Sequence, residues 1–157
     1  MNKTQYEEII ELLIQKNLTI STCESVTSGM IASFFASVPG ASNAFKGGSV
    51  VYSNFAKTLY AKVKQETLNR YGAISEQAAS EMALNTAKLT KTDIAISITG
   101  NAGPVPDENK PVGMAYLGIC LIDKVYVYQL NSKQTERNNI RIDFASLAFD
   151  KLLKLLK

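Results

Sequence analysis

The sequence predicts one α/β domain over residues 1–157, with a three-layer α/β/α sandwich built around a mixed, mostly parallel sheet. Two observations lead to this prediction. Helical and strand-like periodicities alternate along the chain, as in folds where helices cover both faces of a sheet. The stretch 93–98 is almost continuously apolar, which is typical of a strand buried on both faces. With 46% hydrophobic residues, the chain can form one substantial core.

The first half of the chain contains predicted helices and strands in alternation. Residues 4–16 repeat apolar side chains at helical spacing, including Ile9 and Ile14, and Thr4 with Glu7 forms a predicted capping box. The other elements predicted in this half follow from the same kinds of pattern: strands over 18–22 and 47–52, and helices over 27–38, 54–61 and 65–70.

The second half is predicted to end in a strand pair and a long helix. Its elements besides the strand at 93–98 are a helix from Ser75 to about Leu89, strands over 112–121 and 125–130, and a helix over 134–156. A tight turn at Asp123 separates the two strands, which predicts an antiparallel hairpin. The apolar strand at 93–98 is expected at the centre of the sheet.

The composition excludes several classes of chemistry. The sequence has no histidine, which excludes Ser-His-Asp and Cys-His catalysis and removes the commonest zinc ligand. Any general base must therefore be Lys, Tyr, Asp or Glu. Cys23 and Cys120 have no metal-ligand spacing and lie in apolar strand contexts. We therefore expect reduced thiols, no metal site and a cytoplasmic protein.

The charge pattern gives no sign of a nucleic acid or membrane partner. The net charge of +3 is mild, and no Lys/Arg cluster is interleaved with aromatic residues. No apolar run reaches the length of a membrane span, and the first residues do not resemble a signal peptide. We therefore expect a small-molecule partner.

Small polar residues follow three of the predicted strands. These segments are Ser25-Val26-Thr27-Ser28, Tyr52-Ser53-Asn54 and Thr99-Gly100-Asn101. Ligands of open α/β sheets bind outside the carboxyl ends of the strands. One such end is explained by turn formation alone, but three together favour a pocket. Lys57, one helical turn beyond Asn54, is the best available base for a serine, because burial can lower the pKa of a lysine.

Ser25 lies between a predicted strand and a predicted helix. This position suits a nucleophilic serine, and the N-terminus of the helix suits an anion or a developing oxyanion. The alternative is that Ser25 or Thr27 only caps the helix, and this segment alone favours capping.

Four segments in the same order and spacing resemble the C-terminal domain of the CinA (competence/damage-inducible) family, which includes stand-alone nicotinamide mononucleotide (NMN) deamidases. They are residues 24–29, 52–57, 99–104 and 110–113. The resemblance implies hydrolysis of NMN to nicotinate mononucleotide and ammonia, an α/β/α fold, no cofactor or required metal, and commonly a homodimer.

The chain departs from the family pattern at several positions. Val26 and Ser28 replace the family's cysteine and first glycine, Asn101 replaces an apolar residue, and the loop 105–109 is slightly shortened and lacks the usual Gly-Gly. The family's Gly-Asp-Arg is present only as Thr135-Glu136-Arg137. These departures affect the phosphate-ribose end of the expected pocket more than its catalytic positions.

The resemblance and the chemistry together predict a role for each site residue. Ser25 would attack the carboxamide, Lys57 would take its proton, and Tyr52 would orient Lys57 or relay the proton. Attack by a water molecule activated by Lys57 is an alternative. Backbone N–H groups of residues 26–28 would face the oxyanion. The residues predicted to bind substrate are Thr27, Ser28, Gly29, Ser42, Asn54, Thr99, Gly100, Gly103, Arg137 and Arg141.

Alternatives remain for the arginines and for the protein. Arg137 and Arg141 are either phosphate ligands or part of an exposed helix face paired with Glu136 and Asp143. The protein itself is alternatively a family member that binds a mononucleotide without hydrolysing it. A third possibility is an interaction module, because longer family members fuse this domain to a nucleotide-pyrophosphatase-like domain.

Overall fold

A five-stranded mixed sheet forms the middle of the part of the molecule that the structure, a computed structural model, describes (residues 2–157). The strand order is β2-β1-β3-β4-β5, with bounds β1 Ile20–Glu24, β2 Phe45–Val50, β3 Ile94–Asn101, β4 Met114–Leu121 and β5 Lys124–Asn131. β1 is parallel to β2 and β3, whereas β4 is antiparallel to β3 and β5. The α/β class and the central strand are confirmed. The prediction of a mostly parallel sheet is wrong, because parallel and antiparallel pairings are equally frequent.

Two helix-free connections produce the antiparallel half of the sheet. Ile122 and Asp123 alone join β4 to β5, and their φ values of 46° and 69° are those of a turn that matches the twist of a hairpin. The predicted hairpin is therefore confirmed. Residues 102–113, between β3 and β4, contain no helix, so they cannot make the crossover that a parallel pair requires.

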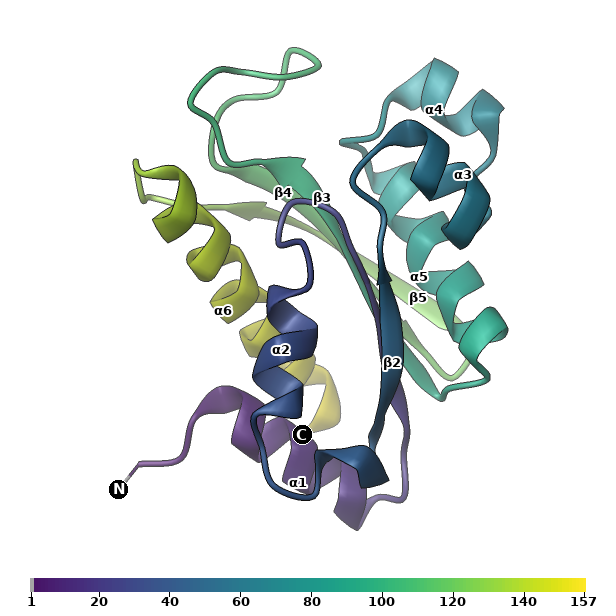
Figure 1. The fold of residues 1–157 in the computed structure, drawn as a ribbon, viewed down its shortest axis with the longest axis vertical. Helices are drawn as coiled ribbons and strands as arrows, with labels where there is room; N and C mark the ends of the chain where they lie inside the picture. Colours follow the sequence, from purple (N-terminus) through teal and green to yellow (C-terminus); the bar gives the residue numbers. More distant parts are fainter. Residues whose placement is uncertain (1) are drawn as a thin grey trace.

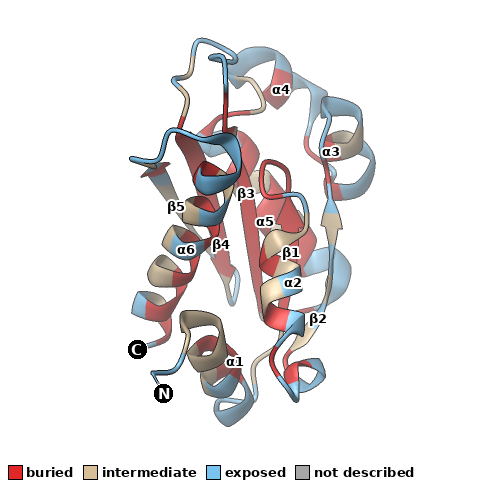
Figure 2. Cartoon of the chain, turned by 60° about the vertical axis from the view of Figure 1, so that its left-hand side comes forward, coloured by how far each residue is buried: buried red, intermediate tan, exposed pale blue. Residues whose placement is uncertain are grey.

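Helices cover both faces of the sheet (Figure 1). On one face lie α1 (Gln5–Gln15), α2 (Met30–Ala36) and α6 (Arg137–Leu156), and on the other lie α3 (Asn54–Ala61), α4 (Gln65–Tyr71) and α5 (Glu76–Thr90). A short 3₁₀ helix, η1 (Ala41–Asn43), precedes β2. Figure 2 shows that the buried residues concentrate on the three inner strands, β1, β3 and β4, and on the helix faces turned toward them. The helices thus bury the inner strands on both sides, whereas the edge strands β2 and β5 are mostly half-buried or exposed.

Two helix starts predicted from sequence are confirmed in detail. The Thr4 hydroxyl accepts the Glu7 N–H at 3.2 Å, and the Glu7 carboxylate accepts the Thr4 N–H at 2.7 Å, which completes the capping box. The Ser75 hydroxyl accepts the Ala78 N–H at 3.1 Å at the start of α5. Each cap contributes about 0.5–2 kcal/mol to the stability of its helix.

The predicted boundaries on either side of Ser25 are wrong. β1 begins and ends two residues later than predicted, and α2 begins at Met30, three residues later. The reason is that Ser28 and Gly29 have φ values of 49° and 93°, which an α-helix does not contain. A turn over 25–29 therefore separates the strand from the helix.

The rest of the predicted interior is largely confirmed. Cys23 and Cys120 are both buried free thiols. Ile14, one of the apolar residues that predicted the first helix, is 41% exposed, whereas Ile9 is fully buried. Across residues 2–157, no helix combines the length and the apolar character that crossing a bilayer requires.

Candidate active site

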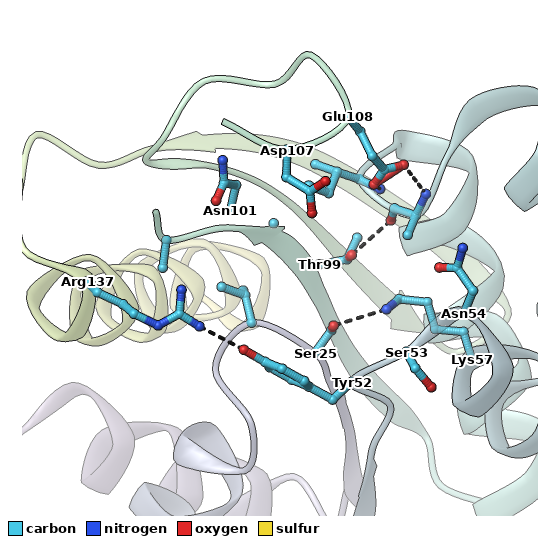
Figure 3. Close-up of a pocket in the computed structure, with 15 residues that line it drawn as sticks. Ser25, Tyr52, Ser53, Asn54, Lys57, Thr99, Asn101, Asp107, Glu108 and Arg137 are labelled. Carbon is cyan, nitrogen blue, oxygen red and sulfur yellow. Dashed lines mark hydrogen bonds between the residues drawn. The ribbon is translucent and has the colours of Figure 1, made fainter. Parts of the chain in front are cut away.

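A pocket of about 310 Å³ opens at the carboxyl ends of β1 and β3, beside the segment that follows β2 (Figure 3). Its volume is in the range of small-molecule sites. All three predicted strand ends contribute to it, as expected for an open α/β sheet. The predicted site residues that line the pocket are Ser25, Tyr52, Asn54, Lys57, Thr99, Gly100 and Arg137.

Ser25 is held by backbone bonds on both sides. Its N–H donates to the Ile98 carbonyl of β3 at 3.0 Å, so the residue continues the sheet's hydrogen bonding beyond β1. Its carbonyl accepts the Ser28 N–H at 3.0 Å, which closes a turn. The side chain is only 9% exposed and points into the pocket (Figure 3).

Lys57 reaches Ser25 from helix α3. The Ser53 hydroxyl caps α3 by accepting the Ala56 N–H at 3.0 Å, which places Lys57 on the inner face of that helix. The Lys57 ammonium nitrogen lies 3.0 Å from the Ser25 hydroxyl and donates to the Val51 carbonyl at 3.0 Å. A lysine that is 3% exposed thus has its terminal nitrogen against the serine oxygen.

The surroundings of Lys57 favour its neutral form. Burial lowers the pKa of Lys57, and Cys23 and Glu108 oppose this shift only in part. Burial also raises the pKa of the Cys23 thiol, so this neighbour carries the charge that opposes the shift only well above neutral pH. A neutral amine beside a hydroxyl is the arrangement that general-base activation requires.

The N-terminus of α2 is occupied by a carboxylate of the chain itself. Glu24, 1% exposed, accepts the N–H groups of Ile31 and Ala32 at 2.9 and 3.0 Å and the Thr27 hydroxyl at 2.6 Å. The alternative that Ser25 or Thr27 caps this helix is therefore wrong, because no side chain acts as its N-cap and Glu24 binds its first-turn N–H groups. These N–H groups are not free for a substrate anion.

Several predicted substrate-binding residues lie outside the pocket. Thr27, Ser28 and Gly29 belong to the turn behind Ser25, where they line a separate shallow concavity with Arg141. Ser42 lies near the start of β2, in another concavity at the opposite end of the strand from Tyr52. The structure therefore does not bring these residues to the pocket.

The two arginines of α6 have different partners. Arg137 lines the pocket and donates to the Gly103 carbonyl and, at 2.7 Å, to the Tyr52 hydroxyl. Arg141 donates to the carbonyls of Val26 and Thr27 at 3.0 and 3.1 Å. Within the described chain, neither arginine forms the ion pair with Glu136 or Asp143 that was the alternative.

Tyr52 does not contact the base as predicted. Its hydroxyl accepts from Arg137, whereas the Lys57 nitrogen is bonded to Ser25 and Val51. Tyr52 is 57% exposed, so its ring forms part of the pocket rim. Tyr52 therefore contacts the proposed phosphate ligand, Arg137, and not the proposed base, Lys57.

The strand end at residues 99–101 shapes the pocket floor and the loop above it. The Thr99 hydroxyl donates to the Ala73 carbonyl at 2.8 Å. A Cβ at Gly100 would lie 2.4 Å from the Ala115 Cβ, so only glycine fits between β3 and β4 there. The Asn101 amide donates to the Val105 carbonyl at 3.0 Å and accepts the Gly103 N–H at 2.9 Å. Asn101, which stands where the family has an apolar residue, therefore organises the loop that follows β3.

Two acidic residues of that loop were missed by the sequence reasoning. Asp107 and Glu108 both line the pocket (Figure 3). The Glu108 carboxylate accepts the N–H groups of Ala73 and Ile74 at 2.7 and 3.0 Å, which ties the loop to the start of α5. The only sequence signal was the altered composition of 105–109. Among residues 2–157, no three Cys, Asp or Glu side chains gather around one potential metal position.

The family model described as the CinA C-terminal domain matches residues 2–156. The chain belongs to this family. It is similar to a competence-damage inducible protein of Clostridium beijerinckii, with 43% identity over 151 residues that cover 96% of this chain and 37% of the relative. A CinA-like protein of Kosmotoga olearia is 46% identical over 145 residues, covering 92% and 35%. The chain thus spans little more than a third of the length of these relatives.

Solved structures of the CinA family have the same fold. A competence/damage inducible protein from Agrobacterium tumefaciens has 30% identity and a TM-score of 0.89, with 100% of this chain and 99% of that chain covered. A CinA superfamily protein from Escherichia coli has 27% identity and a TM-score of 0.93, with 96% and 88% covered. The family resemblance inferred from the four motifs is therefore confirmed.

Proposed function

We propose that this protein hydrolyses the carboxamide of NMN to give nicotinate mononucleotide and ammonia. The observation that carries the proposal is the 3.0 Å contact between the Lys57 nitrogen and the Ser25 hydroxyl, both buried at the base of the pocket. Membership of the CinA C-terminal domain family, which is associated with NMN deamidation, supports the same reaction.

The proposed chemistry uses a serine–lysine pair. Neutral Lys57 keeps its bond to the Val51 carbonyl and accepts the proton of the Ser25 hydroxyl while the serine oxygen bonds to the carboxamide carbon. The carbon–nitrogen bond then breaks, and protonated Lys57 returns its proton to the departing ammonia. Lys57 then takes a proton from water, whose oxygen bonds to the acyl carbon; the bond from that carbon to the Ser25 oxygen breaks, Lys57 returns the proton to the serine oxygen, and the carboxylate product leaves. Direct attack by that water on the amide is the alternative route.

One wall of the pocket carries a charge that can bind a phosphate. Arg137 lines the wall formed by α6, and the two carboxylates of Asp107 and Glu108 lie in the loop over the pocket (Figure 3). An anionic phosphate is favoured beside the guanidinium and disfavoured beside the carboxylates. We therefore propose that Arg137 binds the 5′-phosphate, which directs the pyridine carboxamide toward Ser25.

The test is ammonia release from NMN by the purified protein, with nicotinate mononucleotide measured as the second product. Equal amounts of both products support the proposal. Binding of NMN, detected as a thermal shift, without release of ammonia would instead identify a mononucleotide-binding protein. If neither NMN nor other pyridine mononucleotides shift the melting temperature, the interaction-module alternative is favoured.

A further inference from the structure

Arg141 contacts the backbone immediately after the proposed nucleophile. Its Nε donates to the Val26 carbonyl at 3.0 Å, and its Nη2 donates to the Thr27 carbonyl at 3.1 Å. Its Nη1 donates to the Asn138 side chain at 3.2 Å. The guanidinium of α6 thus binds two consecutive carbonyls that follow Ser25, although it lies over a hundred positions further along the chain.

The first of these carbonyls belongs to the central peptide of a β-turn. The Ser28 N–H bonds to the Ser25 carbonyl, so residues 25–28 form the turn and the Val26–Thr27 peptide lies at its centre. The direction of this central peptide is what distinguishes the common turn types. In a trans peptide the N–H points opposite to the C=O. By holding the Val26 carbonyl, Arg141 also fixes the direction of the Thr27 N–H.

The same turn supplies the backbone donors available next to Ser25. The Ser28 N–H is used within the turn, whereas the N–H groups of Val26 and Thr27 have no acceptor among the described residues. A hydrogen bond from a charged guanidinium to a carbonyl is stronger than a neutral one, and it polarises the N–H of the same peptide. Donors fixed before the reaction are what stabilise a developing oxyanion.

We propose that Arg141 is a positioning residue that holds the Ser25 turn in its catalytic conformation, and that it is not a phosphate ligand. The proposal rests on the proposed amidase function. It is distinct from the role of Arg137, because Arg137 lines the pocket and Arg141 does not. The Glu24 carboxylate holds the opposite side of the turn through the Thr27 hydroxyl, so loss of Arg141 loosens the turn without unfolding it.

The test compares two arginine variants on two substrates, NMN and nicotinamide riboside, which lacks the phosphate. Arg141→Ala should lower kcat by about 10–100-fold on both substrates with KM changed less than about threefold, because misplacement of reacting groups by about 1 Å has this effect. Arg137→Ala should raise KM for NMN alone. Arg141→Lys should restore part of the lost kcat, and Asn138→Ala, which removes only the third contact, should retain full activity.

The outcomes separate this proposal from the function on which it rests. If Arg141→Ala only raises KM for NMN, Arg141 is a phosphate ligand and the proposal is overturned. If its activity stays within threefold of wild type, the turn keeps its catalytic conformation without Arg141, and the proposal is again overturned. If wild type does not hydrolyse the riboside, the kinetics of Arg141→Ala on NMN alone test the proposal: a fall in kcat supports it, and a rise in KM alone overturns it. If wild type releases no ammonia, the amidase function fails. Hydrogen exchange of the Ser28 amide then tests the positioning: about tenfold faster exchange in Arg141→Ala and Arg141→Lys supports it, and unchanged exchange in both overturns it.

Discussion

The inner and outer walls of the pocket are built in different ways. On the inner wall, Ser25 and Lys57 are 9% and 3% exposed, and their neighbours are backbone groups of the strands and of the segment after β2. On the outer wall, Asp107, Glu108 and the rim residue Tyr52 are exposed, and Arg137 lines the pocket from the first position of α6.

This difference matches the role that we propose for each wall. A lysine can serve as a base near neutral pH only if burial lowers its pKa, so it must lie inside the sheet and helix framework. A phosphate ligand must keep its charge, which an exposed guanidinium does without a desolvation penalty. We therefore expect changes on the inner wall to affect kcat and changes on the outer wall to affect KM.

The largest effect is expected at Ser25. Ser25→Ala should lower kcat by about 10³–10⁶-fold, as removal of a nucleophile does in serine hydrolases, while the melting temperature changes by a few degrees at most. A matched control is Thr4→Ala, which removes the N-cap of α1, outside the pocket, and should lower stability by about 0.5–2 kcal/mol with kcat unchanged. Substantial turnover by Ser25→Ala would support attack by water.

The next effect is expected at Lys57. Lys57→Ala should lower kcat by about two to four orders of magnitude through loss of the general base. In wild type, kcat should rise with pH through the lowered pKa of Lys57, because only the neutral amine accepts a proton. A kcat that is independent of pH from about 6 to 10, or activity of the alanine variant within a fewfold of wild type, would remove Lys57 from the mechanism.

Lys57 should also affect stability in a pH-dependent way. Because its pKa is lower in the folded protein, the unfolded chain binds more protons between the folded and unfolded pKa values, and stability rises with pH in that window. Below the pKa that Lys57 has in the folded protein, the amine is charged in both states, and the full cost of burying that charge remains. Lys57→Met should therefore be more stable than wild type at neutral pH and show a weaker pH dependence. Denaturant unfolding across this pH range would measure both effects.

A smaller effect is expected at Arg137 on the outer wall. Arg137→Ala should raise KM for NMN by about 10–100-fold, the equivalent of one or two charge-assisted hydrogen bonds, with kcat changed little. Steady-state kinetics on NMN and on nicotinamide riboside would measure this. Equal hydrolysis of both compounds by wild type would show that no phosphate site exists.

The smallest effect is expected at Tyr52. Its hydroxyl contacts Arg137 and not Lys57, so Tyr52→Phe should raise KM for NMN by about two- to fivefold and leave kcat unchanged. A fall in kcat of tenfold or more would instead restore the proton-relay role predicted from the sequence, and would contradict the division between the two walls.

Two kinds of sequence signal indicate the inner wall. The small residues after β1 and the spacing of Lys57 from the end of β2 are visible in short windows, whereas the lack of histidine is a property of the whole sequence. The helix caps at Thr4 and Ser75 depend on contacts within a few residues, which capping rules describe, and both are confirmed. The contact between Ser25 and Lys57 spans 32 positions, and it was expected from the rule that strand ends of an open α/β sheet form the ligand site.

The outer wall is harder to predict because long-range contacts determine it. Glu108 lines the pocket only because its carboxylate binds the N–H groups of Ala73 and Ile74, more than thirty positions earlier in the chain. Arg137 and Arg141 are one helical turn apart, and nothing in the sequence shows that one meets the pocket and the other the Ser25 turn. The same applies to the sheet, whose antiparallel half depends on the absence of a crossover helix over 102–113.

The carboxylate of Glu24 at the start of α2 has a consequence for how salt affects the protein. This helix end already holds its counter-ion, and because Glu24 is 1% exposed, dissolved ions screen the contact little. Under the proposed function, a substrate phosphate relies instead on Arg137, at the solvent-facing side of the pocket. Attraction between exposed charges is strongly weakened beyond the Debye length, about 8 Å at physiological ionic strength. We therefore expect substrate affinity to depend on ionic strength and the framework that holds Ser25 to depend on it little.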